Sequence, residues 1–385
     1  MKPTQHKEKT TLNWVTTLFL TINPMVAIIG TIVLGYYHAI TWPTIVLGLV
    51  YGIATGLSIT CGYHRLFSHR AYQAKLPVRV FFALFGAAAF EGSVLEWCTD
   101  HRNHHKYTDT DKDPYNAKRG FWYSHIGWLF TLNPKKRDFS NVKELQADPF
   151  LRFQDRYYIP VAIVMGYFVP MLIAGLWGDV LGGLIIASAL RIALNQHITF
   201  CVNSVCHIFG KQTYSDHVTA VDNWFTAFFT YGEGFHNFHH KFPLDYRNGI
   251  RAYHFDPSKW VIKTLYYLGL ASNLRMVSTK RIVESRLRMD ELRLNAKAKT
   301  GNLANLLPML TRTKESVLNS LGKLEELERA YSNLKDKKDE FIREQKALYR
   351  RKKQEIKQTI KQARRDLKRS LSIWSIALKR SLRTV

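Results

Sequence analysis

Nine of the fifteen histidines lie in short patterns that are typical of metal ligation. They are His64 and His69; His101, His104 and His105; His207; and His236, His239 and His240. Residues at i, i+3 and i+4 share one helical face, so each His-x2-His-His pattern directs three imidazoles the same way. Residues five apart differ by about 140° on an α-helix. We therefore expect a helix end or a bend between His64 and His69.

If these clusters converge, they offer more imidazoles than one metal ion binds. One ion takes roughly four to six ligands, so the supply suits two ions. Imidazole suits zinc, copper, iron and nickel, so the residues alone predict a dimetal site without selecting the metal. The other histidines that we considered show no such pattern and are expected to be ordinary surface or core residues: His6, His38, His125, His217 and His254.

Other ligand types also lie near the clusters. Glu233 stands three residues before His236, which is the Glu-x-x-His spacing of di-iron bundles. Its glycine-rich context favours a role in orienting a ligand or loop, and Asp100 before His101 suggests the same role. The cysteines near cluster histidines form no Cys-x2-Cys pattern, so we interpret them as packing residues: Cys61, Cys98 and Cys206.

Charge-free stretches predict the elements that position these side chains. A membrane span needs about 20 apolar residues, and four stretches qualify: residues 12–37, 42–60, 157–178 and 180–210. The first is longer than the apolar part of a signal peptide, and a second span follows it directly. Residues 80–90 and 260–270 are too short to cross and are expected at the interface. Arg191 should face protein, water or headgroups, and a snorkelling position at a helix end stays open.

Lysine and arginine indicate the orientation of the spans. The short turns inside each predicted pair lack them, whereas the N-terminus (Lys2, Lys7 and Lys9) and residues 65–156 carry many. The positive-inside rule places both termini and the central segment in the cytoplasm. We therefore predict an all-α, multi-pass integral membrane protein. Two transmembrane hairpins carry a cytosolic helical cap that holds the dimetal site on the cytoplasmic face.

The net charge of +25 is mostly a property of the C-terminal segment. Residues 280–385 carry 29 Lys and Arg against 13 Asp and Glu, so we divide the chain into residues 1–11, 12–279 and 280–385. Leu327, Leu334, Phe341 and Leu348 recur every seven residues and suggest a short coiled coil or a helical hairpin. A second stripe lies among basic residues and suggests a helix on an anionic membrane: Leu367, Leu371, Trp374, Leu378 and Leu382. No motif supports a nucleic-acid partner.

Four long motifs resemble the membrane-bound fatty acyl desaturases, and within them the stearoyl-CoA type that acts between carbons 9 and 10. The motifs are GYHRLFSHRAY, EWCTDHRNHHKYTDTDKDPYNAKRGFWYSHIGW, VNSVCH and GEGFHNFHHKFPLDYR. The resemblance covers roughly residues 12–279. It implies that the nine histidines hold two iron ions, that Asn203 reaches the centre through water, and that Trp97 lines the acyl tunnel. It also implies O2 as co-substrate and a cis double bond as product.

The resemblance leaves the acyl carrier and the electron donor open. Thr99 stands where the family often has an arginine that binds CoA, so acyl carrier protein or a phospholipid competes with the favoured acyl-CoA. Four basic residues could contact CoA phosphates or an acidic donor: Lys106, Lys112, Lys118 and Arg119. Residues 280–385 contain no histidine or cysteine, so electrons should come from a separate ferredoxin, rubredoxin or b5-type cytochrome with its reductase. A related di-iron hydroxylase and a metal-binding membrane transporter are the alternative functions.

Overall fold

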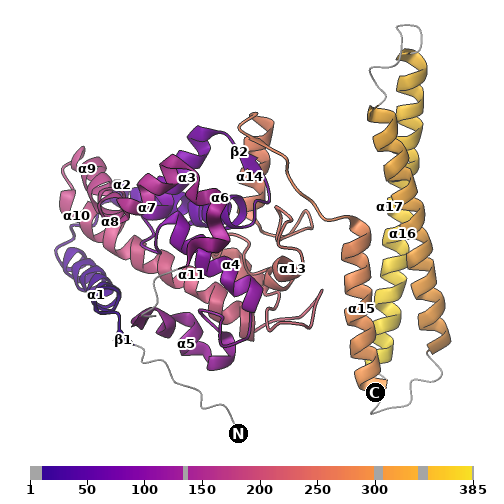
Figure 1. The fold of residues 1–385 in the computed structure, drawn as a ribbon, viewed down its shortest axis with the longest axis horizontal. Coiled ribbons are helices and arrows are strands. Elements are labelled where there is room, and N and C mark those ends of the chain that lie inside the picture. The colour runs from indigo at the N-terminus through magenta and orange to yellow at the C-terminus, as the bar shows by residue number, and fades with distance from the viewer. Residues whose placement is uncertain (1–10, 133–137, 299–306, 337–345, 384–385) are drawn as a thin grey trace. The chain divides into compact units, whose positions relative to one another are not determined.

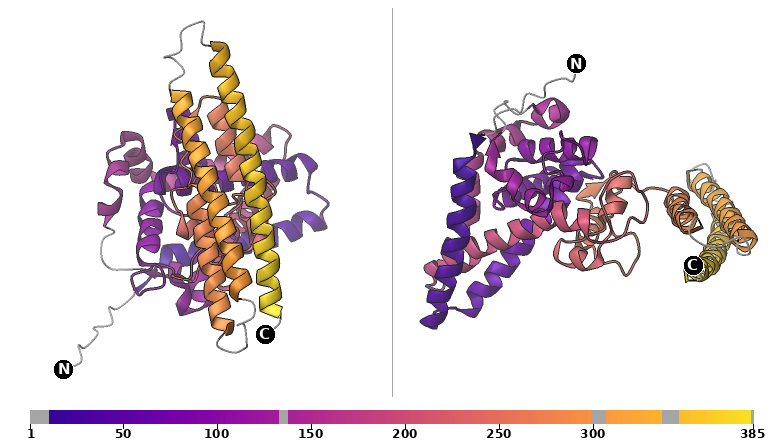
Figure 2. Two further views of the ribbon diagram at one scale, coloured as in Figure 1. Left: turned by 90° about the vertical axis from the view of Figure 1, so that its right-hand side faces the viewer. Right: turned by 90° about the horizontal axis from the view of Figure 1, so that it is seen from below.

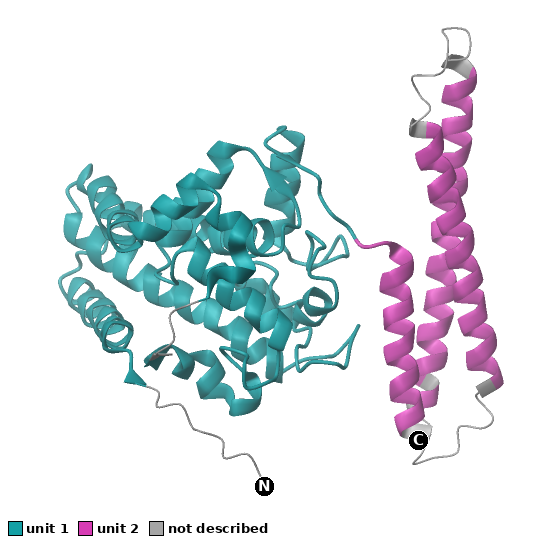
Figure 3. Cartoon of the chain, viewed as in Figure 1, with its two compact units in different colours: residues 1–276 teal, residues 277–385 magenta. Residues whose placement is uncertain are grey.

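The computed structural model describes residues 11–132, 138–298, 307–336 and 346–383. Two compact units make up the chain, residues 1–276 and residues 277–385 (Figure 3). The basic N-terminal residues Lys2, Lys7 and Lys9, and Phe341 of the seven-residue repeat, lie outside the described residues.

Four helical segments of the first unit are long and apolar enough to cross a membrane: Trp14–Tyr36, Trp42–Ser68, Tyr158–Gly175 and Val180–Ile208. This confirms four candidate spans, and Figure 1 shows them along one side of the unit. The first is α1 (Trp14–Tyr36), and the second joins α2 (Trp42–Leu57) to a π-helix, η1 (Ser58–Ser68). The third is α8 (Tyr158–Ile163), η5 (Val164–Phe168) and α9 (Val169–Gly175). The fourth is α10 (Val180–Leu184), η6 (Ile185–Leu190) and α11 (Arg191–Ile208).

Helix η1 ends at Ser68 and His69 is its C-terminal cap, so the predicted helix end between His64 and His69 is confirmed. Residues 58–68 are π-helical, and the His69 N–H donates to the His64 carbonyl oxygen at 3.0 Å. In a π-helix this bond joins residues i and i+5. The π-helical turn before this end therefore places two histidines five residues apart on nearly the same face.

Arg191 faces protein, and the snorkelling alternative is wrong. Its guanidinium donates to the carbonyl oxygens of Ala88 at 2.7 Å and Gly166 at 2.8 Å. The side chain is buried and also lies over the ring of Tyr51. These hydrogen bonds tie the fourth span to the third span and to the residue after helix α3 (Leu76–Ala87), which offsets the cost of burying the charge.

The rest of the first unit contains short helices. They are α3 (Leu76–Ala87), α4 (Val94–Tyr107), η2 (Ala117–Arg119), α5 (Phe121–His125), η3 (Gly127–Phe130), η4 (Phe139–Val142), α6 (Lys143–Gln146), α7 (Pro149–Arg156), α12 (Trp224–Phe229), α13 (His236–Lys241) and α14 (Pro257–Tyr267). Two of them, α4 and α13, carry the two His-x2-His-His patterns. Two antiparallel ribbons join distant parts: β1 (Thr11–Leu12) with β3 (Thr131–Leu132), and β2 (Gln73–Ala74) with β4 (Ala271–Ser272). In register, Thr11 pairs with Leu132 and Gln73 with Ser272.

Helix α4 is fixed in place by its N-terminus and by its packing on η1. Ser93 and Glu96 form a capping box, in which each side chain accepts a hydrogen bond from the other residue's backbone N–H. Apolar side chains from η1, α3 and α4 share one core, which includes Tyr63, Phe82 and Leu95. This core holds η1 and α4 together, and with them two of the three histidine clusters.

The second unit is a bundle of three helices, α15 (Thr279–Ala298), α16 (Leu307–Asp336) and α17 (Lys346–Arg383) (Figure 2). Helices α16 and α17 pack along each other as a helical hairpin, one of the two predicted forms. Leu327 packs against the bundle core, whereas Leu348 is exposed, so the seven-residue repeat does not form one continuous seam.

The apolar stripe of α17 forms part of the bundle core, so the predicted insertion of this stripe into a membrane surface is wrong. Leu367 is 5% exposed and Trp374 is 4% exposed. Both lie in one core with residues of α15 and α16, including Leu287 and Leu321. The Trp374 Nε1–H also donates to Asp290 at 3.0 Å. An apolar stripe on a helix looks the same in sequence whether its neighbour is lipid or another helix.

Candidate metal centre

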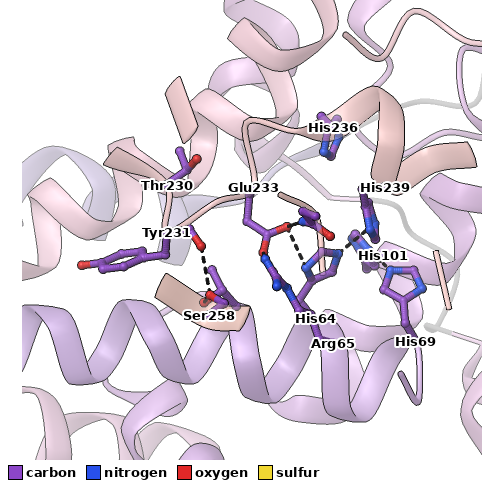
Figure 4. Close-up of polar contacts among 12 residues, drawn as sticks. His64, Arg65, His69, His101, Thr230, Tyr231, Glu233, His236, His239 and Ser258 are labelled. Atoms are coloured by element: carbon purple, nitrogen blue, oxygen red, sulfur yellow. Dashed lines mark hydrogen bonds and ion pairs between the residues drawn. The ribbon is translucent and has the colours of Figure 1, made fainter. Parts of the chain in front are cut away.

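The structure brings the nine predicted histidines together in two groups. The first group has five members, His64, His69, His101, His105 and His239; the second has four, His104, His207, His236 and His240. Within each group, one ring nitrogen of every histidine lies within 4.8 Å of those of the other members. Figure 4 shows His64, His69, His101 and His239 turned toward one another.

Each His-x2-His-His pattern is shared between the two groups. On α4, His101 and His105 join the first group, while His104 joins the second. On α13, His236 and His240 join the second group, while His239 joins the first. The i and i+4 members of a pattern thus turn to one group and the i+3 member to the other. Helices α4 and α13 therefore hold the two groups at a fixed spacing.

The imidazole nitrogens fit metal ions in both groups. In the first, Nε2 of His239 lies 2.9 Å from Nε2 of His64 and 2.9 Å from Nε2 of His105. In the second, Nε2 of His236 lies 3.1 Å from Nε2 of His207 and 3.1 Å from Nε2 of His240. Nitrogens bound at about 2.0–2.1 Å and at right angles to one another would be about 3 Å apart. The inward atoms are therefore spaced as ligands of one ion in each group.

Hydrogen bonds on the outer nitrogens fix the tautomer of several histidines. The Glu233 carboxylate accepts from Nδ1 of His64 at 2.9 Å, and the Asp113 carboxylate accepts from Nδ1 of His104 at 2.9 Å. A carboxylate only accepts, so each of these Nδ1 atoms carries the proton and each Nε2 presents its lone pair inward. Such partners orient metal ligands and raise their basicity.

A hydroxyl relay fixes His207 in the same way. The Thr219 hydroxyl donates its one hydrogen to Asp109 at 2.6 Å. The same oxygen lies 2.8 Å from Nδ1 of His207 and must accept from it. Nε2 of His207 therefore points its lone pair toward the second group. In contrast, the buried Nδ1 of His236 has no hydrogen-bond partner among the described residues.

Glu233 also belongs to a buried ionic cluster. Its Oε1 accepts from Arg65 Nη2 at 2.8 Å, and its Oε2 accepts from Asn248 at 2.6 Å. Arg65 is further paired with Asp256 at 3.0 Å. Burial by itself would raise the pKa of Glu233, but His64 and Arg65 lower it to about 2. The carboxylate is thus charged at neutral pH and available to hold His64.

Burial also keeps the histidines uncharged. It is the largest cause that lowers the pKa well below the usual value for His69, His101, His105, His236, His239 and His240, and neighbouring imidazoles add to it. Only neutral imidazole offers a lone pair to a metal ion. These six histidines are therefore in the binding form at neutral pH.

The other residues singled out by sequence lie at different distances from the groups. The ring of Trp97 stacks on His101, with 4.8 Å between ring centroids, and its Nε1–H donates to Glu91 at 3.2 Å. Asp100 is half-buried on α4 beside His101, and Asn203 is half-buried on α11, one turn before His207. The involvement of Asn203 stays a prediction.

The predicted basic residues are exposed in the last turn of α4 and in the segment that follows it, and we call them the basic strip. Its members are Lys106, Lys112, Lys118 and Arg119. Lys106 and Lys112 both lie over the ring of Tyr107, and Arg119 lies 3.6 Å from the ring centroid of Tyr123. Thr99, by contrast, is buried at 1% exposure. The strip is accessible to an anionic group, whereas Thr99 is not.

The sequence did not indicate which residues hold the outer nitrogens of the histidines in place. Asp113, Asp109 and Thr219 carry no spacing signal because loops bring them to the histidines. Nor did the sequence single out His197, which lies 3.1 Å from Nε2 of His125. Nδ1 of His125 lies 3.0 Å from the Ser204 hydroxyl, and neither His125 nor His197 belongs to a ligand group. The buried cysteines Cys61, Cys98 and Cys206 belong to neither group, as predicted.

Comparisons with known proteins point to one family. The fatty acid desaturase family matches residues 40–272. The chain is 48% identical over 265 residues to a "Probable acyl-CoA desaturase" of Schizosaccharomyces pombe, covering 68% of this chain and 54% of that protein. It is 41% identical over 322 residues to "Acyl-CoA desaturase 1" of Saccharomyces cerevisiae, covering 79% and 62%. It is 42% identical over 258 residues to "Stearoyl-CoA desaturase 5" of Bos taurus, covering 65% and 73%. The matched region thus spans little more than half the length of the two yeast proteins.

Proposed function

Since the chain belongs to the fatty acid desaturase family, we propose that it is a membrane desaturase of saturated fatty acyl chains. The product would be a cis double bond between carbons 9 and 10, made with O2 and two electrons. The division of nine histidines, seven of them buried and two half-buried, into groups of five and four is the observation that carries this function. A centre of two irons needs ligands in two adjacent sets, and this chain provides them.

The residues of the chain prepare the site in three ways. Glu233, Asp113 and Thr219 hold Nδ1 of three histidines, so that their Nε2 lone pairs point inward. Burial lowers the pKa of six of the histidines and so keeps them neutral: His69, His101, His105, His236, His239 and His240. When bound, two iron ions would supply the activation of O2 and the removal of two hydrogens from the chain. Trp97, which stacks on His101, would position the acyl chain beside the first group.

We propose that the four spans form two hairpins below a cytosolic cap. Two short connections meet at one end of the spans, where the Thr41 hydroxyl donates to Asp179 at 2.8 Å. The histidines lie toward the opposite ends of the second and fourth spans, at His64 in η1 and His207 in α11. The positive-inside rule then places the centre on the cytoplasmic side. This arrangement does not suit a transporter, whose ligands would lie near mid-membrane between spans.

The acyl carrier that we propose rests on the names of the relatives and on the basic strip, and an electron donor could use the same strip. Names of the relatives favour acyl-CoA, and the basic strip that begins at Lys106 offers cations to CoA phosphates. An acidic donor would be attracted to the same strip. We propose a ferredoxin, rubredoxin or b5-type cytochrome with its reductase as the electron donor.

The test is the fatty-acid profile of a desaturase-deficient host that expresses the chain. We expect new monounsaturated acids with the double bond between carbons 9 and 10, and none from His239→Ala. His217→Ala is the matched control because His217 is exposed and outside both groups. Hydroxy acids without new monounsaturated acids would refute desaturation and indicate a hydroxylase. Metal accumulation without O2 consumption would indicate a transporter.

A further inference from the structure

Most of the excess positive charge of the second unit lies on one helix. Helix α17 carries 14 Lys and Arg against two acidic residues, whereas α16 carries five of each. One side of α17 packs in the bundle core through Ile360, Leu367 and Trp374. Its charged side chains lie on the remaining, exposed part of the helix surface.

The exposed cations of α17 form one continuous face. Lys357, Lys361, Arg365 and Arg369 follow one another at i+4 spacing, and all four are exposed. Like charges at this spacing repel one another. Lys368 lies between the last two on the same side, and we call these five residues the basic face.

Little in the bundle neutralises this face. Four of its residues, together with Arg364, line a groove of about 700 Å³ between α16 and α17. Arg364 is paired with Glu328 at 2.8 Å. Among the residues that the structure describes, none of the five members of the basic face forms an ion pair with an acidic side chain. An external anionic surface would relieve their repulsion.

Two exposed isoleucines continue the basic face toward the C-terminus. Ile373 is 47% exposed and Ile376 is 52% exposed. Ile376 lies two turns after Arg369, and Lys379 follows it one turn later. Apolar side chains at the end of a row of cations suit the boundary between lipid headgroups and acyl chains. They do not suit the phosphate backbone of a nucleic acid.

We propose that the basic face of α17, with Ile373 and Ile376, docks on anionic phospholipid headgroups. The helix is about 57 Å long, so its cations match an extended surface and not one small anion. The four candidate spans in the same chain would keep such a surface within reach. This docking uses the side of α17 opposite to Leu367 and Trp374, which stay in the bundle core.

The test uses the full chain in lipid nanodiscs, with a polarity-sensitive fluorophore on Ser372→Cys. Ser372 is exposed and lies one turn from both Lys368 and Ile376. Asn319→Cys, on the outer side of α16, is the matched control, and the unmutated chain gives the background from the native cysteines. Discs of phosphatidylcholine are compared with discs of equal parts phosphatidylcholine and phosphatidylserine.

We expect the Ser372 label to brighten and shift to the blue only in the anionic discs, and about 0.5 M salt to reverse the change. The variant Lys361→Gln/Arg365→Gln/Arg369→Gln should lower the ratio of docked to free helix by roughly 100-fold. Ile373→Ser/Ile376→Ser should weaken docking without removing its salt dependence. Circular dichroism would confirm that the bundle is intact in each variant.

Equal emission in both kinds of disc would overturn the docking, as would a full response in the triple variant. A response to added DNA or to an acidic soluble protein in neutral discs, without one to anionic lipid, would assign the face to that partner instead. Desaturase activity is measured in the same discs. Failure of lipid docking is thereby distinguished from failure of the proposed function.

Discussion

Replacing Asp113 by asparagine should remove one metal ion and leave the other. The Asp113 side chain is buried, and its Oδ1 lies 2.9 Å from Nδ1 of His104. Oδ1 also accepts the N–H of Tyr115 at 3.2 Å, and Oδ2 accepts the N–H of Asp109 at 3.0 Å. Both oxygens therefore face donors. An amide keeps one oxygen and turns an NH2 group toward one of those donors.

The expected loss of metal affinity follows from placing the NH2 group of asparagine opposite another donor. Changing the outer partner of a metal-bound histidine costs about 10- to 100-fold in metal affinity, which equals about 1.4 to 2.7 kcal/mol. His104 belongs to the four-histidine group. The loss should therefore fall on that group, while the five-histidine group keeps its ion.

The assay is the number of irons per purified full chain after dialysis against increasing chelator. We expect a chelator range in which the native chain keeps two irons and Asp113→Asn keeps one. Asp111→Asn is the matched control, because Asp111 lies on the same loop but is exposed. Glu233→Gln should instead release the ion of the five-histidine group, through His64. If Asp113→Asn resists the chelator as well as the native chain does, the role of Asp113 in orienting His104 is refuted.

Three further outcomes are expected. His104→Ala and His239→Ala remove a ligand from different groups, so each should abolish product while the protein stays in the membrane fraction; activity in either would contradict a shared centre. Burial raises the pKa of the Glu91 carboxyl group to about 7. The protonated side chain therefore contributes fully to the stability of the fold when the pH is below the pKa of Glu91 in the unfolded chain. This contribution is lost as the pH rises through about 7. The Tm of the Glu91→Gln variant should therefore fall less between pH 6 and pH 8 than the Tm of the native chain. An equal fall in both would contradict the raised pKa of Glu91. Trp374→Ala should cost the second unit about 3–5 kcal/mol, seen by calorimetry, with iron content unchanged; loss of iron would show that the two units are not independent.

Local patterns predicted which histidines could act together, because the patterns repeat histidine at fixed helical spacing. His101, His104 and His105 share one face of α4 whatever lies around it, since that face follows from helical geometry alone. Charge-free stretches likewise predicted four candidate spans, because the length of an apolar helix is a local property. The tunnel, donor and CoA contacts rest on resemblance and stay predictions.

Two features could not be derived from spacing. The π-helical end of the second span places His64 and His69 on one face, whereas α-helical geometry would separate them. Burial of Trp374 in the bundle shows that the apolar stripe of α17 has a protein neighbour. In both cases the sequence pattern is compatible with more than one environment, and packing selects among them.

The sequence by itself determined which residues can bind metal and which segments can cross a membrane, because residue type and helical period are enough for both. Only the tertiary structure decided that His104 and His105, adjacent in sequence, belong to different groups. It alone brought Asp113 and Glu233 to their histidines. Those assignments depend on loops and on the packing of α4 against η1, where contacts join residues far apart in the chain and leave no local periodicity.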